Sequence, residues 1–164
     1  MASSAKDVIS TLTDLIETCK DGANGFREAA GAVTNADAKA LFTSRVPAIE
    51  QAAAELQAEV RRLGGDPETT GSGAAAVHRR WIDLKAAVTG RDEAAILTEC
   101  ERGEELAAKD YENALKTDLP AEVRAVGERQ YHGAVANLER VRALGRAYGA
   151  SAPTVAPTPE ADKH

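Results

Sequence analysis

The chain has 164 residues, a formal net charge of −6 at pH 7 and only 4% aromatic residues. This length suits a single domain with a sizeable core, and the scarcity of aromatic and β-branched residues favours helices over sheets. The negative charge keeps the protein soluble and disfavours nucleic acid as a partner, because its phosphates would be repelled.

Neither a signal peptide nor a membrane span is predicted. The N-terminal stretch MASSAKDVIS lacks an apolar core, and no apolar run reaches the roughly 20 residues that a membrane-spanning helix needs. We therefore expect a cytoplasmic protein with no membrane partner. Cys19 and Cys100 fall on apolar stripes and are too few for a disulfide framework, so both are expected to be small core residues.

The first two predicted helices form a hairpin. Apolar residues at helical spacing predict a helix to about residue 33, which Ser4 or Ser3 can cap. A tight connection at 34–37 leads to a second helix, 37–63, which must run antiparallel because the connection is so short. Pro47 lies inside the second helix, and the Gly-Gly-Asp-Pro run at 64–67 ends it.

A shorter helix is predicted over residues 73–88, before the third long helix. Its apolar face carries Val77, Trp81, Leu84 and Val88. The whole segment between the second and third long helices has about 28 residues, enough to return along a bundle ~40 Å long. Such a crossover makes the second and third long helices parallel, as in ferritin-like bundles.

The last two long helices are predicted at 94–115 and from Pro120 to about residue 148. Gly103 and Ala107 are small and should let a neighbouring helix approach closely, with Glu104 at the edge of the same inward stripe. Residues 149–164 are rich in proline, alanine and threonine and are predicted to be a disordered tail. The bundle itself is expected to span residues 5–148.

Several short runs of residues, taken together with the distances between them, form a fairly specific sequence pattern. They are 14–18, 21–22, 25–27, 55–57, 59–60, 64–68 (GGDPE), 78–79 with Trp81, 99–104 (ECERGE) and 129–131. In these runs the chain resembles, over about residues 6–146, a bacterial family of ferritin-like four-helix-bundle proteins of unassigned function. The resemblance implies a ferritin-like fold and, by analogy alone, a self-associating, stress-related role. Members often carry a histidine where this chain has Leu138.

A ferritin-like di-iron site needs inward glutamates from two helices and Glu-x-x-His from the other two. On a helical wheel the carboxylates of the first helix, including Asp21, lie opposite its apolar stripe. On the second helix Ala53 stands where a histidine would belong. Glu128 and His132 on the fourth helix face away from its core, so we expect neither a di-iron centre nor enzymatic activity.

Five polar residues remain on or beside the inward faces: Glu50, Gln57, Glu104, Gln130 and Asn137. One interpretation is a buried polar network that fixes helix register, because buried polar groups require partners. The other is that Glu50 and Glu104 bind one ion of iron or another divalent metal, with amide or water ligands. His78, beside Trp81, is read either as a half-buried histidine donating to a backbone carbonyl or as a ligand.

The predicted structure is therefore an all-α, ferritin-like four-helix bundle with an additional short helix in the crossover. The predicted function is non-catalytic, structural or interaction-based, with no cofactor. The alternative is a metal-binding protein of the oxidoreductase or metal-storage class that uses Glu50 and Glu104. Self-association through helix faces stays open, and the sequence points to no particular protein partner.

Overall fold

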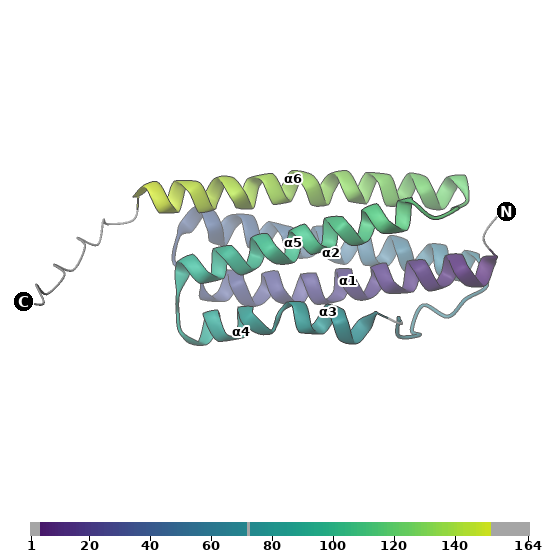
Figure 1. Ribbon diagram of the computed structural model, residues 1–164, viewed down its shortest axis with the longest axis horizontal. Helices are drawn as coiled ribbons and strands as arrows, with labels where there is room; N and C mark the ends of the chain where they lie inside the picture. The colour runs from purple at the N-terminus through teal and green to yellow at the C-terminus, as the bar shows by residue number, and fades with distance from the viewer. Residues whose placement is uncertain (1–3, 72, 152–164) are drawn as a thin grey trace, which may run out of the picture.

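The computed structural model describes residues 4–71 and 73–151, which form helices joined by short connections (Figure 1). The helices are α1 (Ala5–Ala32), α2 (Ala36–Arg62), α3 (Ala74–Arg80), α4 (Ile82–Thr89), α5 (Glu93–Leu115) and α6 (Ala121–Ser151). The four long ones, α1, α2, α5 and α6, pack around a single apolar core. The predicted all-α class is confirmed within the described residues.

Polar caps define where α1 and α2 begin. Ser4 accepts a hydrogen bond from the backbone N–H of Asp7, and Asn35 accepts one from Ala38 at 2.9 Å. The carboxylate of Glu93, in the first turn of α5, accepts from the backbone N–H of Asn35 at 2.9 Å and also from that of Thr34. This contact ties the start of α5 to the α1–α2 connection, where a carboxylate also suits the positive end of α2.

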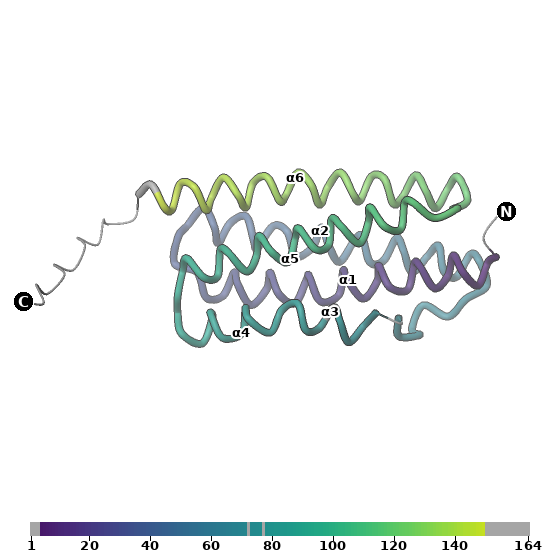
Figure 2. The backbone as a smooth tube through the Cα atoms, viewed as in Figure 1, coloured from purple at the N-terminus to yellow at the C-terminus, as the bar shows by residue number. Residues whose placement is uncertain are grey.

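The crossover has the predicted course but not the predicted continuity. The segment after α2 returns along the bundle beside α1, so α2 and α5 run in the same direction (Figures 1 and 2). The single helix predicted over 73–88 is instead two helices, α3 and α4, that break at Trp81. Of its predicted apolar face, Leu84 is buried and Val88 half-buried, whereas the side chain of Val77 lies outside the described residues.

The Trp81 indole inserts between two glycines of neighbouring helices. A Cβ atom added at Gly25 of α1 or at Gly103 of α5 would lie under 3.0 Å from the Trp81 ring. The ring also meets Phe26 edge-on, with 5.7 Å between ring centroids. The close neighbour that Gly103 admits is thus the aromatic side chain at the junction of α3 and α4.

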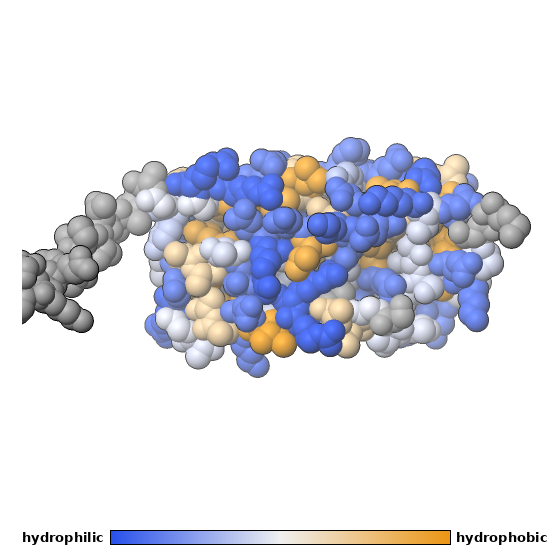
Figure 3. All heavy atoms as spheres, in the orientation of Figure 1, coloured by the Kyte–Doolittle hydropathy of each residue, from blue (hydrophilic) through white to orange (hydrophobic). Residues whose placement is uncertain are grey.

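The surface of the bundle is largely polar. In Figure 3 hydrophilic side chains cover most of the visible face, and apolar ones form small, separate groups. Ile82, at the start of α4, is an exposed large apolar residue. None of the helices in the described part of the chain is long and apolar enough to cross a membrane. Helix α6 continues to Ser151, beyond the predicted end at residue 148, and the rest of the predicted tail, 152–164, lies outside the described residues.

We predict that Gly103→Ala and Gly145→Ala have opposite effects on the free energy of unfolding, measured by urea denaturation. Both glycines are helical. Alanine at Gly103 would collide with Trp81 and should destabilise by about 1–3 kcal/mol, whereas a Cβ at Gly145 meets nothing within 4 Å and should stabilise by up to about 1 kcal/mol. Equal effects of the two substitutions would contradict the proposed close contact.

Candidate functional site: a pocket at the centre of the bundle

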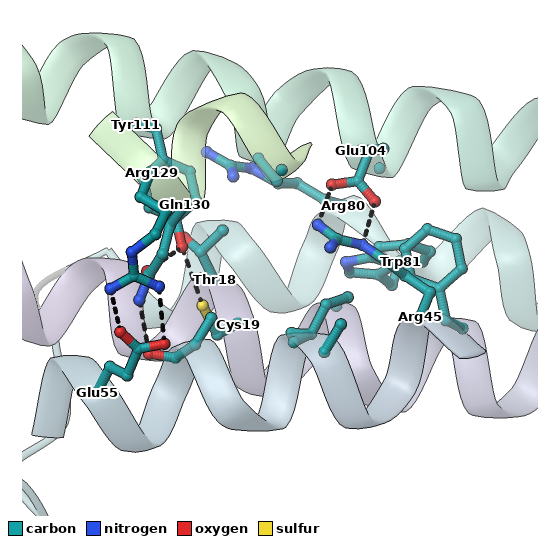
Figure 4. A pocket seen from close by; sticks show the side chains of 18 residues that line it. Thr18, Cys19, Arg45, Glu55, Arg80, Trp81, Glu104, Tyr111, Arg129 and Gln130 are labelled. Carbon is teal, nitrogen blue, oxygen red and sulfur yellow. Dashed lines mark hydrogen bonds and ion pairs between the residues drawn. The ribbon is translucent and has the colours of Figure 1, made fainter. Parts of the chain in front are cut away.

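A pocket of about 160 Å³ lies in the middle of the bundle, between α2 and α6 (Figure 4). All four long helices and Trp81 contribute to its lining. Exposed Ala48 of α2 and exposed Gly133 of α6 stand at its opening. The chemistry of the pocket is set by three polar clusters and one surface ion pair.

The first cluster surrounds the carboxylate of Glu104, whose side chain is only 2% exposed. Arg45 donates to it through both Nη2, at 3.0 Å, and Nε, at 3.3 Å. Asn137 donates to the same carboxylate from Nδ2 at 2.8 Å. A forked guanidinium and an amide therefore compensate a charge that would be costly to bury alone.

The second cluster is a chain of hydrogen bonds from α1 to α2. Gln130 Nε2 donates to the Ala52 carbonyl at 3.1 Å, which leaves Gln130 Oε1 to accept from the Tyr111 hydroxyl at 2.8 Å. Because the Tyr111 hydroxyl donates its only proton to Gln130, the Cys19 thiol must be the donor in its 3.3 Å contact with Tyr111. Burial raises the pKa of Cys19 to about 11, which agrees with a protonated thiol.

The third cluster joins the crossover to α1 and α5. Arg80 pairs with both oxygens of Asp110, at 2.9 Å for Oδ1, and the Thr18 hydroxyl donates to Asp110 Oδ2 at 2.9 Å. At the pocket opening, Arg129 of α6 forms an ion pair with Glu55 of α2. The hydrogen bonds from Arg129 lower the pKa of Glu55 below its ordinary value.

The residues predicted for the site are brought together only in part. Gln130 and Asn137 are buried in the clusters described above, whereas half-buried Gln57 is not among the residues that line the pocket. Glu50 does not project inward as expected: its side chain is 56% exposed and pairs with Arg27 at 2.7 Å. Glu50 therefore lies at the surface, and Glu104 has Arg45 as its counterion.

Sequence reasoning missed Arg45, although a signal for it was present. Arg45 follows Phe42 by three residues and precedes Ile49 by four, and both of those residues are buried. This spacing places Arg45 on the inward face of α2. It was overlooked because arginine is usually an exposed residue.

His78 also differs from expectation, because it is exposed and its partner is a carboxylate. Its Nδ1 lies 2.6 Å from Oδ2 of Asp21, a buried oxygen, so the contact is a hydrogen bond when Nδ1 carries a proton. Asp21 is buried because α3 and α4 cover the face of α1 that was expected to meet solvent. Burial raises the pKa of Asp21 above its ordinary value of 3.8, while His78 acts in the opposite direction.

Comparison with known families decides the affiliation of the chain. A family model described as Domain of unknown function (DUF2383) matches residues 7–117, which is more than half of the chain. The chain belongs to this family. No curated protein matches it.

One solved structure supports the fold of this DUF2383 protein. The chain is similar to a two-domain protein from Anabaena variabilis that contains DJ-1/ThiJ/PfpI-like and ferritin-like domains, with a TM-score of 0.78 and 14% sequence identity. The match covers 96% of this chain and 41% of that one, so the chain spans less than half the length of its structural relative. At this identity the likeness concerns the fold alone, and it confirms the predicted ferritin-like bundle.

The residues at the centre of this DUF2383 bundle do not fit a di-iron centre. Such a centre needs about four carboxylates and two histidines converging between the helices. Within residues 4–71 and 73–151, no group of three or more His, Cys, Asp or Glu side chains is placed to hold a metal ion. The inward carboxylate of Glu104 already accepts hydrogen bonds from Arg45 and Asn137.

We predict that the two partners of the central ion pair are not equally replaceable. Arg45→Met leaves the buried Glu104 with Asn137 alone and should lower the free energy of unfolding by about 3–5 kcal/mol. Glu104→Gln should cost less, about 1–3 kcal/mol, because the Arg45 side chain is 16% exposed and can turn to water. Urea denaturation of both single variants and of the double variant measures these losses. The double variant should recover part of the stability that Arg45→Met loses. Losses below about 1 kcal/mol for both single variants would contradict the analysis.

A second prediction concerns the dependence of stability on pH at Asp21. Because the folded-state pKa of Asp21 is raised, its ionised form destabilises the folded protein above that pKa, and this cost disappears below the ordinary value of 3.8. Asp21→Asn should therefore be more stable than the natural protein at pH 7, with a difference that shrinks as the pH falls toward 4. Denaturation curves at both pH values test this, and a variant that is less stable at pH 7 would contradict it.

Proposed function

We propose that this DUF2383 protein is a non-catalytic helical bundle with a structural or interaction role. The observation that carries the proposal is the buried carboxylate of Glu104, both of whose oxygens accept hydrogen bonds, from Arg45 of α2 and Asn137 of α6. In a ferritin-like oxidoreductase the inward carboxylates of the bundle hold metal ions. Here the inward carboxylate instead joins α5 to two other long helices.

The role of such a cluster is to specify how the helices align. A buried ion pair is weak evidence for stability, since apolar residues of similar volume often serve equally well. It does penalise any helix shift that would separate Glu104 from Arg45, because a buried charge would then be left unpaired. Within this proposal the folded unit is the bundle of residues 5–148, located in the cytoplasm, and its outer helix faces are available for contacts with other proteins.

Iron loading tests the non-catalytic proposal. The full-length protein is purified, ferrous iron is added in air, and bound iron and oxygen consumption are measured. We expect no stoichiometric iron binding and no oxygen consumption above the buffer rate. Glu128→Gln, which removes an exposed carboxylate of α6, serves as the matched control for Glu104→Gln.

One outcome would overturn the proposal in favour of a metal-binding oxidoreductase. It is stoichiometric iron binding, one or two irons per chain, that Glu104→Gln abolishes and Glu128→Gln preserves. That result would mean that Arg45 leaves the Glu104 carboxylate when metal enters. Iron lost equally in both variants would indicate surface binding and would leave the proposal standing.

A further inference from the structure

Part of the wall of the central pocket is apolar. The rings of Phe26 and Trp81 and the side chain of Ile49 face it, together with Ala52 and Ala107. Glycines 22, 103 and 133 also belong to the lining and contribute backbone without side chains. The flat surfaces that result suit a planar ring, and aromatic side chains bind a second ring more favourably than an aliphatic chain.

The polar groups of the pocket are already engaged with one another. Each charged side chain in the lining has a partner: Arg45 pairs with Glu104, Arg80 with Asp110, and Arg129 with Glu55. Tyr111 and Gln130 are joined in the chain of hydrogen bonds that ends at the Ala52 carbonyl. A charged ligand would have to break these contacts and would be costly to bury, whereas an uncharged ligand leaves them intact.

The size of the pocket limits the ligand to about one ring. Its volume is about 160 Å³. In another protein, an engineered apolar cavity of about 150 Å³ stays dry and binds benzene. Larger ring systems would exceed this volume.

An exposed ion pair lies at the rim of the pocket. Arg129 and Glu55 bridge α6 and α2 there, and the Arg129 side chain is 60% exposed. Ion pairs that are so exposed contribute little to stability, because water screens them and their side chains lose entropy. The pair therefore presents little barrier to a ligand that enters the pocket.

From these four observations we infer that the pocket is a binding site for a small, uncharged molecule with a single aromatic ring. The site is lined by Phe26, Ile49 and Trp81, and Arg129 and Glu55 lie at its opening. This inference goes beyond the proposed structural or interaction role and does not depend on it. Failure to bind the ring would leave the iron experiment unaffected, and the reverse also holds.

The test uses toluene as the probe and benzoate as a charged compound of similar size. The full-length protein is titrated with each, and binding is followed by calorimetry and by the fluorescence of Trp81, the one tryptophan of the chain. We expect saturable toluene binding with a Kd on the order of 1 mM or below, a shift in Trp81 emission with the same midpoint, and no binding of benzoate.

Two alanines of α2 provide a matched pair of variants. Ala52→Leu fills the pocket and should raise the Kd for toluene by about tenfold or more. Ala54→Leu introduces the same side chain at an exposed position outside the lining and should leave the Kd within about twofold. If Ala52→Leu does not fold, Ala48→Leu at the opening takes its place.

Three results would overturn the inference. The first is the absence of saturable toluene binding to the natural protein. The second is benzoate binding as tight as toluene binding, which would show a polar site. The third is equal affinity of the Ala52→Leu or Ala48→Leu variant and the Ala54→Leu variant, which would place the ring elsewhere on the bundle.

Discussion

The insertion of Trp81 between α1 and α5 is the contact on which the arrangement of the crossover depends. The indole occupies space that is available only because Gly25 and Gly103 have no side chains. It also marks the break between α3 and α4, so the crossover helix is interrupted where its largest side chain enters the bundle. The same ring forms part of the pocket wall. Attachment of the crossover and the shape of the pocket are therefore two consequences of one packing event.

Burial by the crossover changes the chemistry of α1 as well as its packing. A helix in a plain four-helix bundle has one buried face and one face in water. In this protein α3 and α4 cover part of the outer face of α1, and Asp21 there becomes a buried carboxylate with a raised pKa. His78, supplied by α3, approaches that carboxylate at 2.6 Å. The crossover thus both creates the electrostatic cost and contributes the group that offsets it.

The course of the fold could be predicted from the sequence because it depends on the periodicity of apolar residues and on segment length. The four long helices and the parallel arrangement of α2 and α5 follow from these two quantities. The site could be predicted where residues lay on or beside an inward stripe, as Glu104, Gln130 and Asn137 do. Glu50 was expected to face inward but lies at the surface, because a long charged side chain at the edge of a stripe can turn either way. The break at Trp81 and the burial of Asp21 arise from contacts between distant segments, which periodicity does not report.

The central cluster shows how one fold can serve different chemistry with few changes. Ferritin-like bundles direct side chains from four helices toward a common level in the core, and carboxylates at that level attract cations. In this DUF2383 protein the cation is a guanidinium that is covalently part of α2, so the charge of Glu104 is neutralised without a free ion. Once the carboxylate, the tyrosine and the amide are all paired within the protein, the remaining space in the core is bounded mainly by apolar atoms. The pairing that makes the centre a poor metal site is therefore the same pairing that makes it suitable for an uncharged ring.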